Sequence, residues 1–94
     1  MLYLVAGILK PGSEEQLIKF RNEFSEHLAQ PYRKIVLAGA LRGKDGKRQG
    51  YLAFIEAENF DDAQAYLNQS PLFQNELYER VEVAEFNAEV GYIE

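Results

Sequence analysis

The sequence predicts an α+β fold in which strands and helices follow one another in the order β-α-β-β-α-β. Three segments are apolar at both their odd and their even positions, which is typical of strands covered on both faces. Two other segments repeat apolar residues every three or four positions, as an amphipathic helix does. Asp45-Gly46, between two of the strand segments, is a turn signal of β-hairpins. Together these patterns predict an antiparallel sheet of four strands.

The first strand and the first helix are predicted within the first 30 residues. Met1–Leu9 is the strand, and the Lys-Pro-Gly sequence after it ends it. A helix then begins at Ser13, with Gln16 three residues later completing a capping box. Pro31 marks the end of this helix, whose apolar stripe consists of Leu17, Phe20, Phe24 and Leu28.

The next two strands form a hairpin. Lys34–Leu41 and Gln49–Ala57 are the strands, and both have apolar residues on both alternating sets. Arg42–Lys47 connects them and contains the Asp-Gly turn.

A second helix and a final strand complete the chain. Asn59 or Asp61 can cap the helix, which ends near Ser70 because Pro71 follows, and Pro71–Leu77 can add one further helical turn. The last strand spans Tyr78–Tyr92, with a β-bulge near Ala84-Glu85 where its apolar positions change parity. This order of elements is ferredoxin-like, and we expect residues 1–94 to form one domain.

A count of the sheet faces predicts a homodimer. Two helices cover only one face of a four-stranded sheet, yet the first three strands are apolar on both faces. An uncovered apolar face of this size marks a partner surface. A second copy, packed sheet against sheet about a two-fold axis, is the simplest partner.

The composition excludes several classes of function. No cysteine occurs, so disulfides, zinc–thiolate sites, iron–sulfur clusters and thiol catalysis are excluded. A formal net charge of −5 disfavours nucleic acid as a partner, because phosphate neutralisation supplies most of that affinity. No apolar stretch approaches the ~20 residues of a membrane span, and none has the flanks of a signal peptide. We therefore expect a cytoplasmic protein with no membrane contact.

The charge is divided unevenly along the chain. Residues 1–50 carry a net charge of +4 and residues 51–94 a net charge of −9. In a two-fold dimer, each basic half can meet the acidic half of its partner. Such an arrangement sets orientation and association rate more than affinity.

Three segments resemble YCII-related proteins, and together they cover nearly the whole chain. They are "MLYLV" at the start, "HLAQPYRKIVLAGALRG" (His27–Gly43) and "IEAENFDDAQAYLNQSPLFQNELYERVEVAEF" (Ile55–Phe86). The resemblance implies a dimeric α+β barrel and a small cytoplasmic protein. It also implies a pocket with a histidine paired with an aspartate, and a few relatives act as dehalogenases or lyases on muconate-like ring-cleavage products.

The sequence departs from this family at two positions. The family aspartate directly precedes the helix-stop proline, whereas Ser70 precedes Pro71 here. The family arginine three residues before the histidine is Phe24 here. Ser70 can hydrogen-bond an imidazole, but it cannot supply the negative charge that raises the basicity of the ring.

The candidate site combines these observations. His27 and Ser70 are the candidate catalytic residues, with His27 as the acid or base. Candidate ligand contacts are Arg42 at the end of a strand, Gly39 and Leu41 in the Gly-x-Leu motif, Phe54 and Pro71. Further aromatic residues that can line a cavity are Tyr3, Phe86 and Tyr92. We expect no metal and no cofactor.

Alternatives remain open for the basic groups. His27 can equally be a histidine hydrogen-bonded at a helix end, where the helix dipole favours its charged form. The basic stretch Arg33–Arg48 can be a solvated hairpin, or it can meet acids of the last strand across a subunit or neighbouring-strand contact, namely Glu82, Glu85 and Glu89.

Two functions follow from the sequence. The first is a YCII-like enzyme in which His27 transfers a proton on a small organic acid or lactone, in lyase, isomerase or dehalogenase chemistry. Its partners are then a second copy of the chain, or a higher assembly, and a small anionic or aromatic-derived metabolite. The second is a non-catalytic ligand-binding or assembly module that has lost the His-Asp dyad.

Overall fold

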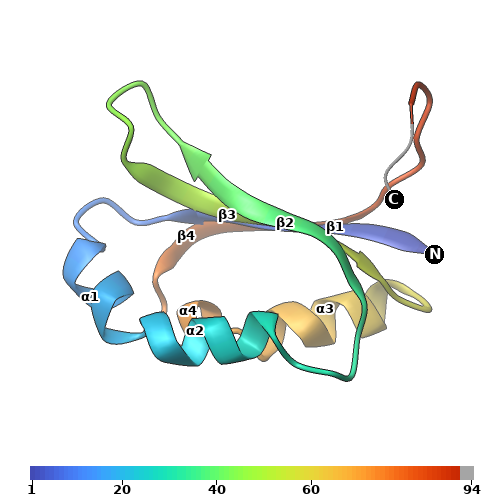
Figure 1. Ribbon diagram of the computed structural model, residues 1–94, viewed down its shortest axis with the longest axis horizontal. Coiled ribbons are helices and arrows are strands. Elements are labelled where there is room, and N and C mark those ends of the chain that lie inside the picture. The colour runs from blue at the N-terminus through green and yellow to red at the C-terminus, as the bar shows by residue number, and fades with distance from the viewer. Residues whose placement is uncertain (92–94) are drawn as a thin grey trace.

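The computed structural model describes residues 1–91, and one antiparallel sheet runs through this part of the chain (Figure 1). Its strands are β1 (Leu2–Leu9), β2 (Ile35–Arg42), β3 (Arg48–Glu56) and β4 (Tyr78–Glu85). They lie in the order β2-β3-β1-β4, and every neighbouring pair is antiparallel. The predicted ferredoxin-like α+β arrangement is confirmed.

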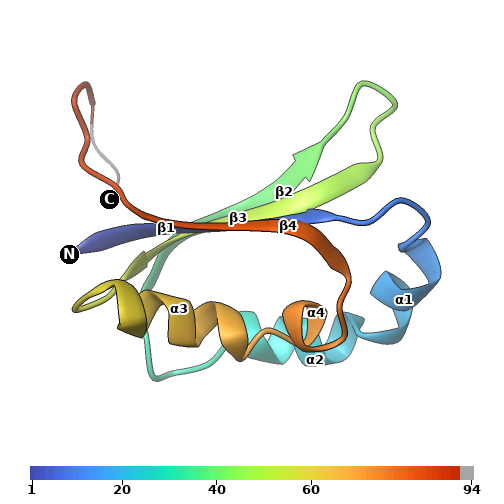
Figure 2. The same ribbon diagram turned by 180° about the vertical axis from the view of Figure 1, so that it is seen from behind.

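The helices of the described residues lie on one side of the sheet, as Figures 1 and 2 show from opposite directions. They are α1 (Glu14–Lys19), α2 (Arg21–Leu28), α3 (Phe60–Asn68) and the short α4 (Pro71–Gln74). None of these helices is long and apolar enough to cross a membrane.

The single helix predicted from Ser13 is in fact two helices. The break is at Phe20, where φ is −100° and ψ is 12°. Phe20 still packs against the same apolar cluster as Leu17 and Leu28. Because the apolar stripe continues across the break, the spacing of apolar residues gives no sign of it.

The predictions for where helices begin, and which residues cap them, are only partly correct. Ser13 makes no capping hydrogen bond, and its hydroxyl donates instead to the carbonyl of Lys10, so the predicted capping box is wrong. Asn59 caps α3 as predicted, because its Oδ1 accepts the Asp62 amide at 2.8 Å. Pro71 begins α4, where its missing N–H costs nothing.

The last strand is irregular at its start and shorter than predicted. Ile8 and Leu9 of β1 pair with Arg80 and Tyr78, so the extra residue is Glu79, and the bulge predicted near Ala84-Glu85 is wrong. The strand ends at Glu85 because β1, against which it pairs, begins at Leu2. The predicted end at Tyr92 lies outside the described residues.

The core lies between the helices and the sheet. One buried cluster gathers around Tyr3, Ile55 and Ala63, and a second around Phe24 and Leu72. Alternate residues of β1 are buried on this side, and Gly7 is the one among them that has no side chain. A Cβ atom at Gly7 would lie 2.4 Å from the Tyr78 ring, so glycine provides the space for that ring.

The other face of the sheet is not covered by helices (Figures 1 and 2). Its apolar side chains are half-buried or exposed, and Leu37 is 55% exposed. The prediction that the helices cover one face of the sheet is confirmed. The residues of this open face include Leu2, Leu4, Ala6, Ile8, Leu37, Leu52 and Phe54.

Candidate functional site

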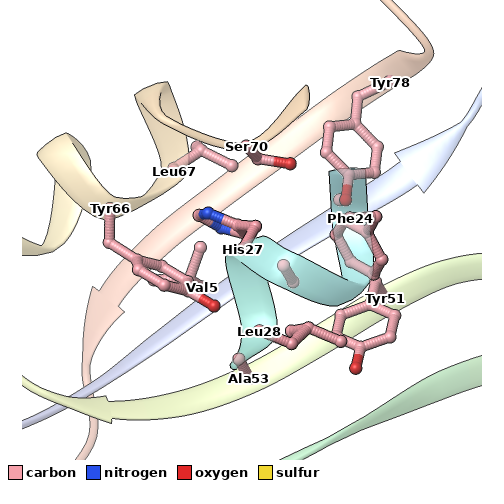
Figure 3. Close-up of a pocket in the computed structure, with 12 residues that line it drawn as sticks. Val5, Phe24, His27, Leu28, Tyr51, Ala53, Tyr66, Leu67, Ser70 and Tyr78 are labelled. Carbon is pink, nitrogen blue, oxygen red and sulfur yellow. The ribbon is translucent and has the colours of Figure 1, made fainter. Parts of the chain in front are cut away.

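A small cavity lies between α2, α3 and the covered face of the sheet (Figure 3). His27 and Ser70, the two candidate catalytic residues, both line it. Its volume is about 20 Å³, which is room for about one water molecule. The fold therefore brings together two residues that are 43 positions apart in the sequence.

His27 lies in the last turn of α2 and is half-buried. Its ring stacks on the Tyr66 ring of α3, with ring centroids 4.4 Å apart and an interplanar angle of 26° (Figure 3). Burial lowers the pKa of His27 from its ordinary value of 6.5. The neutral imidazole, which can accept a proton, therefore predominates at neutral pH.

Two hydroxyl groups at the cavity have no hydrogen-bond partner among the described residues. They are Ser70 Oγ and the Tyr66 hydroxyl, and the two residues are 3% and 4% exposed. Burial raises the pKa of Tyr66 to about 12, so this hydroxyl keeps its proton and can donate it in a hydrogen bond. Buried polar groups without partners are uncommon and costly, so these hydroxyls mark a place for a bound polar atom.

Tyr78 closes another side of the cavity, where it packs against Gly7. Burial raises the pKa of Tyr78 to about 12, and the Ser70 hydroxyl, which is close to it but outside hydrogen-bonding geometry, acts in the opposite direction. Phe24 and Tyr51 meet edge to face beside it, with centroids 4.7 Å apart. The cavity is therefore aromatic, with neutral hydroxyl groups as its polar lining.

An ion pair lies near the Tyr66 ring. The Arg33 guanidinium lies 6.0 Å from the centroid of the Tyr66 ring, and its Nη2 donates to Asp62 Oδ1 at 2.8 Å. The hydrogen bond from Arg33, together with one from the Glu58 amide, lowers the pKa of Asp62 to about 2. This pair links the segment before β2 to the start of α3, close to the ring on which His27 stacks.

The five predicted ligand contacts do not line the cavity of His27 and Ser70. Gly39 and Leu41 border a shallow hollow on the open face. Phe54 lies on the same face, where its ring packs against that of Phe86 at 4.9 Å. Pro71 begins α4, and Arg42 donates from Nη1 to the Gly46 carbonyl at 2.8 Å within its own hairpin.

The neighbouring-strand contact proposed for the basic stretch is wrong within one chain. β4, which carries Glu82 and Glu85, pairs with β1, whereas the basic hairpin joins β2 to β3 on the other side of β1. The order of strands in the sheet separates these charges, and the spacing of apolar residues does not reveal that order. Among the described residues, the one base of this stretch in an ion pair is Arg33, and its partner Asp62 is on α3.

Sequence reasoning missed Gly7 and four aromatic residues of the cavity, namely Phe24, Tyr51, Tyr66 and Tyr78. Tyr66 precedes Ser70 by four positions, and a helical spacing of four places both residues on one face. Tyr51 shares strand parity with the buried Ala53, so its side could have been assigned. Tyr3 is instead in the core against Phe60, and Tyr92 lies outside the described residues.

No group of three or more metal-binding side chains is found in residues 1–91. The chemistry that the cavity supports is proton transfer by a neutral imidazole, with hydroxyl donors beside it. A carbonyl or phenol oxygen is the kind of ligand atom that the unpartnered hydroxyls can bind.

Two solved structures share this fold. One is 5-chloro-2-hydroxyhydroquinone dehydrochlorinase (TftG) from Burkholderia phenoliruptrix AC1100 in complex with 2,5-dihydroxybenzoquinone. It is 23% identical with a TM-score of 0.83, covering 93% of this chain and 94% of that chain. The other, an uncharacterized NIPSNAP domain protein from Burkholderia xenovorans, is 11% identical with a TM-score of 0.52, covering 97% of each chain. At these identities the likeness concerns the fold.

Sequence comparison gives the family. No curated protein matches the chain. The family model of the YCII-related domain matches residues 1–87, which include every strand and helix described above. The chain therefore belongs to the YCII-related domain family.

Proposed function

We propose that this chain is an enzyme that transfers a proton on a small organic acid or lactone, with His27 as the acid and base. One observation carries the proposal. A half-buried imidazole with a lowered pKa shares a cavity with two buried hydroxyls that lack partners. A general base needs such a neutral ring, and a developing oxyanion needs such donors.

The proposed step moves one proton and one electron pair. A ring nitrogen of His27 takes a proton from the ligand carbon beside a carbonyl group, and the electron pair moves onto the carbonyl oxygen. Ser70 or Tyr66 donates a hydrogen bond to that oxygen. The imidazolium then returns the proton at another position, which completes an isomerisation. Alternatively, the electron pair expels a leaving group as an anion, and the imidazolium gives its proton to water.

Ser70 changes the balance of this step relative to a His-Asp dyad. A carboxylate at this position would stabilise the imidazolium, whereas a hydroxyl stabilises the oxyanion of the ligand. The Tyr66 ring holds the imidazole plane instead, at a centroid distance of 4.4 Å. The proposed enzyme therefore relies more on binding the oxyanion than on a strong base.

The similar dehydrochlorinase supports the ligand class. Its substrate is a chlorinated hydroxyhydroquinone and its complex contains a dihydroxybenzoquinone. An aromatic-derived, anionic metabolite and dehalogenase-type chemistry are accordingly part of the proposal for this chain. Ser70, in place of the family aspartate, favours a second candidate, a module that binds such a compound without turning it over.

We also propose that the chain acts as a cytoplasmic homodimer in the form of an α+β barrel. The support is the open face, whose apolar side chains remain partly accessible on strands that are otherwise buried by helices. A second copy packed on this face would bury them.

The test is deuterium exchange and chloride release. Chlorinated hydroquinones and unsaturated lactones are incubated with the protein in D₂O, and exchange at carbon is followed by NMR. The variant His27→Gln is expected to lose about 100-fold in rate. The control Glu26→Gln, an exposed position of the same helix, should retain the wild-type rate. Turnover that persists in His27→Gln contradicts the proposal, and binding of these compounds without exchange favours the module.

A further inference from the structure

A second and larger hollow adjoins the His27 cavity. This outer groove lies between α1, α2 and the start of β3, and its volume is about 450 Å³. Phe24, Leu28 and Tyr51 line both the groove and the cavity, so they form the wall between the two. Small-molecule sites have volumes of roughly 300–1,000 Å³, so a ring fits the groove and does not fit the cavity.

The floor of the outer groove is apolar. Leu17, Ile18 and Leu72 line it in addition to the three shared residues. Ile18 is 69% exposed although it lies on the helix side of the molecule. An accessible aliphatic side chain in a hollow of this size suits the apolar body of a ligand.

Two arginines give the groove a positive charge. Arg21 and Arg48 line it, against Glu14 as the one acid among its lining residues. Within residues 1–91, neither guanidinium has a carboxylate partner within 4.0 Å. The Arg48 guanidinium lies 5.9 Å from the centroid of the Tyr51 ring, which places it at the wall shared with the His27 cavity.

A β-bulge directs Arg48 to this side of the sheet. Leu41 and Arg42 of β2 pair with Gly50 and Arg48 of β3, so Gln49 is an extra residue. In a regular strand, residues 48 and 51 would point to opposite faces. The extra residue reverses the side to which the preceding residue points. The Arg48 side chain therefore lies on the same side of the sheet as the Tyr51 ring.

We propose that the outer groove binds the body of a cyclic or aromatic carboxylate, with Arg48 and Arg21 holding the carboxylate group. The ring lies against Phe24, Leu28 and Tyr51. This inference rests on the proposed function and names its ligand class. It also makes Arg48 a ligand contact, the role that the sequence had suggested for Arg42.

Benzoate and benzamide test the inference because they differ in charge and hardly in shape. Each is titrated into ¹⁵N-labelled full-length protein, and amide shifts give both the affinity and the place of binding. Benzoate should shift the amides of Ile18, Leu28 and Tyr51 and bind at least about tenfold more tightly than benzamide. Arg48→Gln should lose that tenfold preference, Arg21→Gln part of it, and Arg48→Lys should keep most of it.

Lys44→Gln, at the tip of the hairpin, is the matched control because it removes the same charge far from the groove. It should change the benzoate affinity by less than about twofold. Three results would overturn the inference. Benzoate and benzamide could bind equally tightly, Lys44→Gln and Arg48→Gln could lose benzoate affinity equally, or the amide shifts could fall on the open face. His27→Gln should bind benzoate normally, so failure of the groove and failure of the proposed catalysis give different results.

Discussion

The two faces of the sheet carry similar apolar patterns but have different surroundings. On β1, alternate residues are buried against the helices, and the residues between them are half-buried on the open face. The covered face contains hydroxyls, an imidazole and the cavity. The open face is lined mainly by aliphatic and phenylalanine side chains, with charged residues toward its border at Glu56, Arg80 and Glu82. The polar groups of the cavity come from both layers, with His27 and Tyr66 on helices and Tyr51 and Tyr78 on strands. The proposed chemistry therefore concerns one face of the sheet and the proposed dimer contact the other.

The largest difference between the faces should appear when a side chain is added to a glycine of each. Gly7→Ala places a Cβ atom 2.4 Å from the Tyr78 ring on the covered face, and overpacking of this kind costs about 3 kcal/mol of unfolding free energy. Gly39→Ala on the open face meets no atom within 4 Å and should cost less than about 0.5 kcal/mol. Urea denaturation measures both values, and equal losses would contradict the comparison.

A charge on the open face should act on assembly. Leu37→Asp puts a carboxylate on a residue that is 55% exposed in one copy, and the dimer should weaken by about 2 kcal/mol, or 30-fold in Kd. Ile18→Asp, on the helix side and 69% exposed, serves as the matched control and should leave the mass unchanged. Sedimentation equilibrium checks both variants. A wild-type protein that is monomeric at micromolar concentration would contradict the proposed dimer.

The ion pair near Tyr66 should make the covered face sensitive to acid. The pKa of Asp62 is lowered to about 2 from 3.8, so its contribution to stability is present above pH 4 and is lost as the pH falls toward 2. Asp62→Asn should remove this loss, and its stability should change less than that of the wild type between pH 5 and pH 2.5. Asp61→Asn, at the neighbouring exposed position, should behave as the wild type. Chemical denaturation at the two pH values distinguishes the variants.

The smallest effect concerns His27 itself. Because burial lowers its pKa below 6.5, protonation favours the unfolded chain, and stability should fall as the pH drops through the unfolded value. NMR titration of the ring should give a midpoint below 6.5. Tyr66→Leu removes the stacked ring and exposes the imidazole, so its midpoint should move back toward 6.5. A midpoint above 6.5 in the wild type would show that the helix dipole outweighs burial.

The fold followed from the sequence because each strand and helix has its own local pattern. The Asp-Gly turn, the Asn59 cap and the proline at position 71 are short-range signals, and the structure places them as predicted. The break at Phe20 and the bulges at Glu79 and Gln49 depend on which strands and helices meet, so they leave no local trace.

The sequence predicted the candidate site only in part, because some of its residues are placed by contacts between strands and helices. His27 and Ser70 could be found through their resemblance to a family. Tyr66 could have been found by its helical spacing from Ser70, because both lie on one face of α3 and the turn after it. Arg48 could not, because an unpaired bulge residue reverses the side to which a strand residue points.

Ser70 belongs to the cavity and is also the residue from which α4 begins. Serine, aspartate and asparagine are interchangeable at such helix starts, and an extended backbone before proline suits all three. The charge of the cavity can therefore change during evolution by a substitution that leaves the backbone untouched. In the proposed site, aspartate at position 70 would favour a protonated imidazole, whereas serine would favour an anionic ligand.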